Sequence, residues 1–235
     1  GILLAAGCGS RFGANKLLAP LADGTPLAIA TARRLRSALG EVVAVVRRGD
    51  PVLSALLTAE GLQVVVCENA HTGMGASLTA GVAASSEARG WLIALADMPF
   101  IKDSTLRRVV QALETGALLV APFHAGRRGH PVGFHSSFRD ELLALSGDAG
   151  AREILTRHAT SLTRLDVDDA GIVLDVDTPA DLAALLAGQR AARGVGLAET
   201  HDPVVLRVEG DNEAGLGHRV TQQWALAGIN LQGLT

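Results

Sequence analysis

The chain of 235 residues has no tyrosine, only 3% aromatic residues and only two cysteines. So few aromatic rings weaken any interpretation based on stacking of nucleic-acid bases. Cys8 and Cys67 cannot build a disulfide framework or a four-cysteine zinc site, and they favour a reducing, cytoplasmic compartment. No apolar run approaches the ~18–20 residues that cross a bilayer, so we expect no membrane contact.

The chain also lacks an excess of charge of either sign, because 21 Lys and Arg residues nearly balance 24 Asp and Glu residues, for a net charge of −3. This balance argues against a broad nucleic-acid-binding surface, which shows a strong basic excess. Apolar residues make up 48% of the chain, enough for a sizeable core. The length predicts one large domain with at most a small appendage. Because Gly1 stands inside an apolar run, we expect the natural chain to start earlier.

Short apolar runs alternate with stretches of helical spacing. The runs predict strands at residues 2–6, 42–46, 64–66, 91–96, 118–121, 131–134 and 172–176. The helical stretches fall near residues 27–34, 52–57, 78–83, 106–113, 138–145, 151–158 and 178–186. Strands that alternate with helices predict a three-layer α/β, Rossmann-like fold with a mostly parallel sheet. In such sheets ligands bind at the carboxyl ends of the strands.

The chain divides into three predicted parts. Residues 1–187 form the main domain, and residues 188–203 read as a polar, glycine-punctuated linker. Residues 204–235 then begin a new strand, helix and strand. Such a unit cannot bury its apolar face alone. We therefore expect it to be truncated or completed by another subunit, with an incidental amphipathic tail as the alternative.

The first predicted strand runs into a glycine-rich, cationic loop over residues 7–16. Its backbone N–H groups could surround an anion, and Arg11 and Lys16 suit a triphosphate. The P-loop pattern fails because Gly9 and Gly13 are one residue too close, and the dinucleotide pattern fails because its third glycine falls one residue late. The alternative is a glycine-rich turn with surface charges.

Carboxylates follow two predicted strands. Asp97 stands at the end of the run 91–96, where one or two carboxylates could hold Mg²⁺ together with phosphate oxygens. Asp175 and Asp177 would share one face of the predicted strand 172–176, and one of them could complete the site. The alternative for Asp97 and for Asp177 is the capping of the helix that follows.

Two further loops are candidates for ligand contacts. Residues 126–131 form a mobile-looking cationic loop that could meet an anionic second substrate, with His130 as hydrogen-bond donor. Residues 69–77 follow the third strand and could hold a nucleobase at the start of a helix. A solvated basic loop and a plain strand-to-helix connection are the respective alternatives. The sequence has no HExxH motif or Cys/His cluster for zinc.

Taken together, four segments resemble the nucleotidyltransferases of molybdenum cofactor biosynthesis, the MobA-like NTP transferases. They are residues 4–18 (LAAG, SRFG and KLL), 96–99 (ADMP), 129–132 (GHPV) and 175–179 (DVDTP), in the family's order. The first segment alone indicates the wider superfamily with a glycosyltransferase-A-like fold. The Gly-His-Pro and Asp-x-Asp-Thr-Pro segments are most similar to the cytidylyltransferase branch, because the guanylyltransferase branch usually lacks Gly-His-Pro.

This resemblance implies a role for each matching position. The residues implied to bind the nucleotide are Ala5, Ala6, Gly7, Gly9, Arg11 and Lys16, and those near the base and ribose are Asn69, Gly73 and Ser77. Asp97 would hold Mg²⁺, with Asp177 preferred to Asp175 as the second ligand, and His130 would face the pterin phosphate. Arg11, Lys16 and Asp97 would be the catalytic residues.

The resemblance implies transfer of CMP from CTP to the phosphate of molybdopterin, with release of pyrophosphate. A guanylyltransferase for the same cofactor, a cytidylyltransferase for a sugar or polyol phosphate and a non-catalytic nucleotide-binding regulator remain alternatives. Residues 204–235 resemble the first half of an ACT domain, although Ala214 replaces the usual proline. That segment implies an effector sensor or a homodimer contact, and the family implies a molybdoenzyme partner.

Overall fold

The computed structural model describes residues 1–7, 12, 15–147 and 150–194, with residues 188–194 described by their backbone alone. Cys8, Gly9 and Arg11 lie outside the described residues. So do most of the expected linker and the whole ACT-like segment, so the predicted division into domains stays a prediction. No helix in the described part of the chain is both long and apolar enough to span a membrane.

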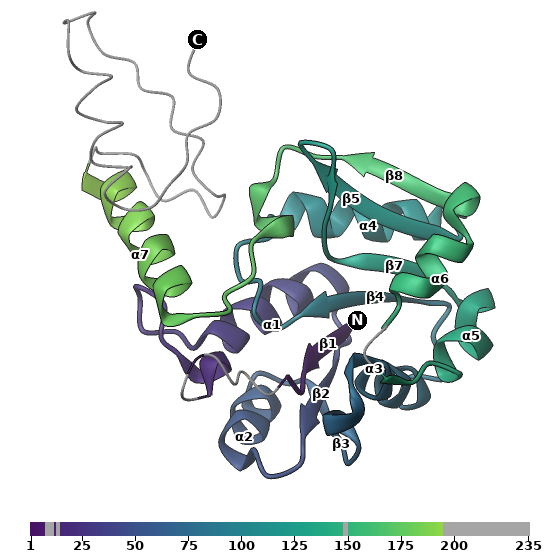
Figure 1. Ribbon diagram of the computed structural model, residues 1–235, viewed down its shortest axis with the longest axis horizontal. Helices are drawn as coiled ribbons and strands as arrows, with labels where there is room; N and C mark the ends of the chain where they lie inside the picture. The colour runs from purple at the N-terminus through teal and green to yellow at the C-terminus, as the bar shows by residue number, and fades with distance from the viewer. Residues whose placement is uncertain (8–11, 13–14, 148–149, 195–235) are drawn as a thin grey trace, which may run out of the picture.

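The described chain is built around an eight-stranded sheet in the order β3-β2-β1-β4-β7-β5-β6, with β8 beside β5 (Figure 1). The strands are β1 (Ile2–Ala5), β2 (Val43–Arg47), β3 (Gln63–Cys67), β4 (Gly90–Leu95), β5 (Leu119–His124), β6 (Arg127–Arg128), β7 (Val132–His135) and β8 (Leu162–Asp166). Strands β3, β2, β1 and β4 are parallel to one another, and β5 is parallel to β8. Strand β7 pairs antiparallel with β4 and β5, and β6 pairs antiparallel with β5. The predicted mostly parallel sheet is confirmed.

Helices cover both faces of this sheet, as the continuous apolar strands require. One face carries α1 (Leu27–Leu39), α2 (Pro51–Ala59) and α4 (Asp103–Glu114), and the other carries α3 (Met74–Ala83), α5 (Arg139–Leu143) and α6 (Arg152–Arg157). In β1 the residues alternate between the two cores, with Leu3 and Ala5 on the first face and Ile2 and Leu4 on the second. The predicted three-layer α/β architecture is confirmed.

The strand order places a topological switch between β1 and β4. The chain runs from β1 through β2 to β3 on one side, then crosses back to place β4 on the other side of β1. Connections therefore leave the carboxyl ends of β1 and β4 in opposite directions, and in open α/β sheets ligands bind at such a point. The loop that starts at Gly7 and the turn that carries Asp97 both follow these ends.

The predicted strand at residues 172–176 is wrong. Residues Ala170–Val173 form a 3-10 helix, and the extended residues after it pair with no strand among the described residues. The Asp169 carboxylate accepts from the Gly171 N–H at 3.0 Å and so starts the turn. Gly171 lies so close to Phe100 that a Cβ would stand 2.1 Å from the Phe100 carbonyl oxygen.

Other boundaries differ in smaller ways. Helix α7 (Pro179–Gly194) starts where predicted but continues through residues 188–194, which the sequence pattern assigns to the linker. Its first turns pack on the core through Leu182, and the helix then projects away from the sheet (Figure 1). The sequence analysis also missed β8, an edge strand in which no residue is fully buried.

Candidate active site

Asp97 follows β4 in a turn that hydrogen bonds tie to β1, to α1 and to the segment around Val176. The Ala96 N–H donates to the Leu4 carbonyl at 3.0 Å, which ties the turn to the end of β1. The Thr31 hydroxyl of α1 lies 3.1 Å from the Ala96 carbonyl oxygen. The Asp97 carbonyl accepts from the Val176 N–H at 3.1 Å, which brings the segment around Asp177 alongside.

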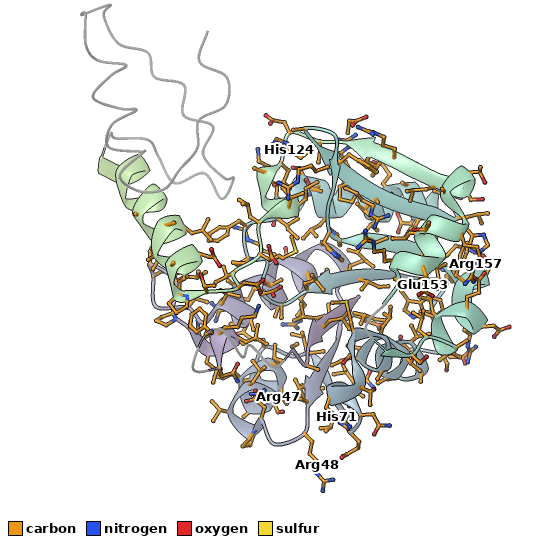
Figure 2. All side chains as sticks on the ribbon, viewed as in Figure 1. Arg47, Arg48, His71, His124, Glu153 and Arg157 are labelled. Carbon is orange, nitrogen blue, oxygen red and sulfur yellow. The ribbon has the colours of Figure 1, made fainter. Side chains whose placement is uncertain are left out.

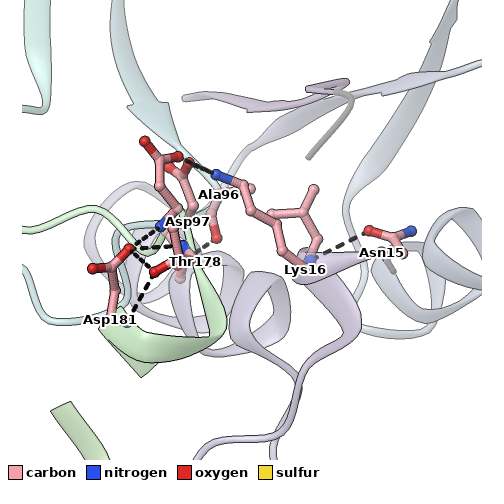
Figure 3. A network of polar contacts seen from close by, with 9 residues as sticks. Asn15, Lys16, Ala96, Asp97, Thr178 and Asp181 are labelled. Atoms are coloured by element: carbon pink, nitrogen blue, oxygen red, sulfur yellow. Dashed lines mark hydrogen bonds and ion pairs between the residues drawn. The ribbon is translucent and has the colours of Figure 1, made fainter. Parts of the chain in front are cut away.

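Lys16 joins the two carboxylates that the sequence analysis selected. Its Nζ lies 2.8 Å from Asp97 Oδ2 and 2.8 Å from Asp177 Oδ1 (Figure 3). The three residues, here called the Lys16 cluster, come from segments separated by 81 and 161 positions of sequence. Burial lowers the pKa of Lys16, but its hydrogen bonds to Asp177 and Asp97 outweigh burial, and the pKa lies above its ordinary value. Lys16 is therefore a permanent cation at neutral pH.

The helix cap beside the cluster leaves the Asp177 carboxylate directed at Lys16. The Asp181 carboxylate accepts from the Thr178 N–H at 2.7 Å and from the Thr178 hydroxyl at 2.8 Å. In return the Thr178 hydroxyl accepts from the Asp181 N–H at 3.2 Å, which completes a reciprocal cap (Figure 3). These hydrogen bonds from Thr178 hold the pKa of Asp181 below its ordinary value. Thr178 and Asp181 thus cap this helix, which is the role that the sequence analysis gave as the alternative for Asp177.

The cluster fits a divalent cation. Two carboxylates from different segments converge on one point, which the Lys16 ammonium occupies. The second oxygen of Asp97, Oδ1, is buried and has no hydrogen-bond partner in the described residues. Mg²⁺ takes one or two carboxylates and completes its shell with water and phosphate oxygens. Among the described residues no group of three or more His, Cys, Asp or Glu side chains could hold a metal ion, so the cluster offers two carboxylates. Asp175 is exposed and is not part of the cluster.

The sequence analysis missed the contacts of Asn15, which hold the backbone next to Lys16. The Asn15 side-chain N–H donates to Asp50 Oδ2, and Asn15 Oδ1 accepts from the Leu17 N–H at 3.2 Å. Asp50 is buried and also caps α2 through the Leu53 N–H at 3.3 Å. The Asp50-Pro51 pair is a helix-start signal, but its contact with Asn15 spans 35 residues and depends on the fold.

The nucleotide-loop residues have different surroundings. Ala5 and Ala6 are buried at the end of β1, and Gly7 is exposed. A Cβ added at Gly7 would meet no atom of the described residues within 4 Å. Gly9 and Arg11 lie outside the described residues, and their role stays a prediction.

The residues expected near the base lie at the start of α3. Asn69 is exposed, and Gly73 has a φ of 129° immediately before the helix. Ser77 lies inside α3 with 5% of its surface exposed, so it offers a ligand little area. None of the three forms a hydrogen bond with the Lys16 cluster in the described part of the chain.

The Gly-His-Pro segment is more rigid than the sequence suggested. The Gly129 N–H donates to the Pro122 carbonyl and the His130 N–H donates to the Ile172 carbonyl, both at 2.9 Å. A Cβ at Gly129 would stand 2.2 Å from the Ile172 carbonyl oxygen, so only glycine fits. The expected mobile loop is thus anchored at its second half, and it presents the His130 ring from a fixed backbone.

Comparison with known proteins identifies the family. Residues 1–162 match the model of the MobA-like NTP transferase domain. Nicotine blue oxidoreductase of Paenarthrobacter nicotinovorans is 32% identical over 194 residues, which cover 79% of this chain and 95% of that protein. Purine catabolism protein PucB of Bacillus subtilis is 33% identical over 189 residues, which cover 76% and 91%. Molybdenum cofactor cytidylyltransferase of Escherichia coli is 25% identical over 182 residues, which cover 77% and 91%.

Solved structures show the same relationship. Rv0371c from Mycobacterium tuberculosis superimposes with a TM-score of 0.71 at 30% identity, covering 79% of this chain and 96% of that one. The same protein has been crystallised in complex with manganese, and that structure has a TM-score of 0.67 at 29% identity with the same coverage. The family match, the α/β fold and the carboxylate pair at the switch point agree, and the chain belongs to the MobA-like NTP transferase family of nucleotidyltransferases.

Proposed function

We propose that this protein is a cytoplasmic cytidylyltransferase that moves CMP from CTP to the phosphate of molybdopterin and releases pyrophosphate. The Lys16 cluster is the observation that carries the proposal. Two carboxylates that can bind a cation and a lysine that can bind phosphate, together with the exposed backbone of Gly7, suit a polyanionic substrate that arrives with a metal ion. Manganese in the Rv0371c structure supports a divalent metal, and we propose Mg²⁺ here.

Asp97 and Asp177 would hold the metal, which when bound neutralises charge on phosphate oxygens and so favours attack at the α-phosphorus. Lys16 would exchange its carboxylate partners for phosphate oxygens of the triphosphate, since its ammonium stays charged. Gly7 would bring backbone N–H groups against the same phosphates, together with Arg11 as the family resemblance implies. The attacking phosphate is already ionised near pH 7, so positioning supplies much of the catalysis and no strong general base is required.

The choice of CTP and molybdopterin rests on sequence support. The Gly129-His130-Pro131 segment resembles the cytidylyltransferase branch, and a named molybdenum cofactor cytidylyltransferase is among the relatives. Guanylyltransfer to the same cofactor keeps the same chemistry and is the nearest alternative. Because a relative at 32% identity is named nicotine blue oxidoreductase, reduction of nicotine blue is a second alternative. A molybdoenzyme that receives the product, and a homodimer contact through residues 204–235, are the partners that we propose.

The test is pyrophosphate release in Mg²⁺, with CTP or GTP and with molybdopterin, ribitol 5-phosphate or no acceptor. Reduction of nicotine blue by a nicotinamide cofactor is measured in parallel. We expect release only with CTP and molybdopterin, and its loss in Asp97→Asn. Pyrophosphate release with GTP but not with CTP overturns the choice of base. Nucleotide binding without release under any condition overturns nucleotidyl transfer and favours a regulator.

A further inference from the structure

A buried carboxylate outside the Lys16 cluster joins two segments of the chain. Asp169 follows β8 and has 1% of its surface exposed. Its Oδ2 accepts from the Lys102 N–H at 2.9 Å and from the Thr105 hydroxyl at 2.6 Å, and its Oδ1 accepts from the Gly171 N–H at 3.0 Å. Burial of a carboxylate is costly unless hydrogen bonds satisfy it, and here both oxygens have donors. The carboxylate thus ties the start of α4 to the 3-10 helix Ala170–Val173, here called the η6 turn.

The first of these segments leads directly from the Lys16 cluster. Residues 97–102 run from Asp97, after the end of β4, to the start of α4. Lys102 is the last residue before α4, and its own side chain makes no cap hydrogen bond, so the Asp169 carboxylate is the acceptor at this helix start. A negative charge is favourable there, because the N-terminus of a helix carries a partial positive charge. Asp169 therefore fixes the far end of the turn that begins with Asp97.

The second segment contacts the candidate active site at two points. The Ile172 carbonyl accepts from the His130 N–H at 2.9 Å, and the Val176 N–H donates to the Asp97 carbonyl at 3.1 Å. Asp177, the second carboxylate of the cluster, follows Val176 directly. The side chains of Ile172 and Val176 are fully buried, so the stretch between them is anchored in the core. The position of the η6 turn therefore determines where Asp177 stands relative to Asp97.

The backbone on both sides of Asp169 is fixed. After it, Gly171 lies so close to the Phe100 carbonyl that there is no room for a Cβ. Before it, the Val167 N–H donates to a carbonyl of β5 at 2.9 Å. The ring of His124, labelled in Figure 2, lies beside the same residue, with Nδ1 3.2 Å from the Val167 carbonyl oxygen. Asp169 thus lies between two tightly packed points and not on a free loop.

We propose that Asp169 is a positioning residue of the nucleotidyltransferase site, which sets the separation of the Asp97 and Asp177 carboxylates by holding the η6 turn against the start of α4. Its effect passes through the backbone of the two segments, because its own hydrogen bonds go to neither carboxylate. Loss of a residue that orients metal ligands typically costs about 10- to 100-fold in metal affinity. The inference rests on the proposed function for the metal that the two carboxylates bind.

The test is Mn²⁺ binding to the full chain in the presence of CTP, followed by electron paramagnetic resonance at a temperature at which melting curves show the variants folded. Asp169→Asn replaces one acceptor oxygen by an NH₂ group, which faces a donor whichever way the side chain turns. We expect Mn²⁺ affinity to fall by about tenfold in this variant. Unchanged Mn²⁺ affinity in folded Asp169→Asn overturns the inference.

Thr105 provides a milder version of the same test. Thr105→Val removes the hydroxyl that donates to Asp169 and changes side-chain size little, so we expect Mn²⁺ affinity to fall by about threefold. Thr105→Ser keeps the hydroxyl and should restore the affinity. If Asp169→Asn does not fold, the Thr105 pair decides: unchanged affinity in Thr105→Val, or no recovery in Thr105→Ser, overturns the inference.

Two controls separate positioning from a general loss of stability. Asp168→Asn changes the exposed carboxylate next to Asp169 and should keep Mn²⁺ affinity. Ser85→Ala removes the hydroxyl that accepts from Trp91 Nε1 at 2.9 Å, in the core on the other face of the sheet, and should lower the melting temperature without weakening Mn²⁺ binding. An equal loss of Mn²⁺ affinity in Ser85→Ala overturns the inference.

The proposed reaction can fail independently of this inference. If Mn²⁺ affinity falls in Asp169→Asn and the controls keep it, but CTP and molybdopterin give no pyrophosphate with the unaltered chain, the proposed reaction fails while the positioning role stands. If the unaltered chain releases pyrophosphate and folded Asp169→Asn binds Mn²⁺ equally well, the reaction stands and the positioning role fails.

Discussion

The two polar regions of this protein differ in how their charges are satisfied. In the Lys16 cluster the charges satisfy one another, because one ammonium contacts two carboxylates at 2.8 Å each. A cavity of about 160 Å³ lies between α3, α6 and the start of β7. There the guanidiniums of Arg128 and Arg152 and the buried Nδ1 of His130 have no hydrogen-bond or ion-pair partner within the described residues. The charges of the first region are neutralised within the protein, whereas no described residue neutralises those of the second.

This difference separates two kinds of recognition. The Lys16 cluster suits a substrate that brings both signs of charge, as a metal triphosphate does. The cavity instead combines aliphatic side chains with two exposed guanidiniums. If the cluster holds the metal, the loss of one of its carboxylates should abolish turnover, and other changes should have smaller effects on kcat, nucleotide affinity or stability.

The largest effect should follow the loss of Asp97. In Asp97→Asn we expect turnover to fall by about 10³-fold or more, because the carboxylate supplies charge to the metal and holds Lys16. The variant should keep its fold, which a circular dichroism spectrum and a melting curve check. The matched control is Asp175→Asn, which changes an exposed carboxylate and should retain turnover. Near-wild-type turnover in Asp97→Asn would remove Asp97 from the metal site.

Lys16→Ala should affect binding more than folding. The chain has one other lysine, Lys102, so Lys102→Ala is the control. We expect the dissociation constant of CTP to rise by about tenfold or more in Lys16→Ala, because a charged hydrogen bond to phosphate is lost. Isothermal titration calorimetry measures it, and an unchanged constant would count against the phosphate role.

The sequence already predicted the parts of the site that depend on local signals. Leu4 to Lys16 and Ala96 to Pro99 follow buried apolar runs, and such runs predict strands whose ends carry ligands. The sequence also predicted a helix that begins near residue 178, and the Thr178–Asp181 pair caps it. These features depend on neighbours within a few residues.

Features that depend on distant segments could not be predicted in this way. Asp50 contacts Asn15 across 35 residues, and Gly171 adopts its turn because Phe100 lies against it. Strand β8 has polar, exposed residues on an edge, so no apolar run marks it. Arg152 looks like an ordinary surface residue of a helix until the cavity beside it is seen.

Thr31 offers a test of how precisely Asp97 must be held. Thr31→Val removes the hydroxyl beside the Ala96 carbonyl without changing side-chain size much. We expect kcat to fall by about three- to tenfold and the free energy of unfolding to fall by about 1 kcal/mol. Thr31→Ser should restore kcat while the KM for the acceptor stays constant in both variants. A loss of stability with kcat unchanged would make Thr31 a structural residue alone.

The smallest effect concerns the pH dependence of stability. Because the pKa of His130 lies below 6.5 in the folded protein, the unfolded chain binds more protons than the folded one at acid pH. Stability should therefore fall as pH drops below about 6.5, until the lowered pKa is reached. His130→Gln should lack this part of the decline, as melting temperatures between pH 7.5 and 5 would show. The same decline in both proteins would show that His130 accepts a proton normally.

The most direct test of the central claim is Mn²⁺ binding in the presence of CTP, followed by electron paramagnetic resonance. The compared proteins are the unaltered chain, Asp97→Asn, Asp177→Asn and Asp175→Asn. The account predicts one bound Mn²⁺ in the unaltered chain and in Asp175→Asn, and binding weakened by about tenfold or more in the other two. Equal Mn²⁺ affinity in all four proteins would contradict the assignment of the Lys16 cluster as the metal and nucleotide site.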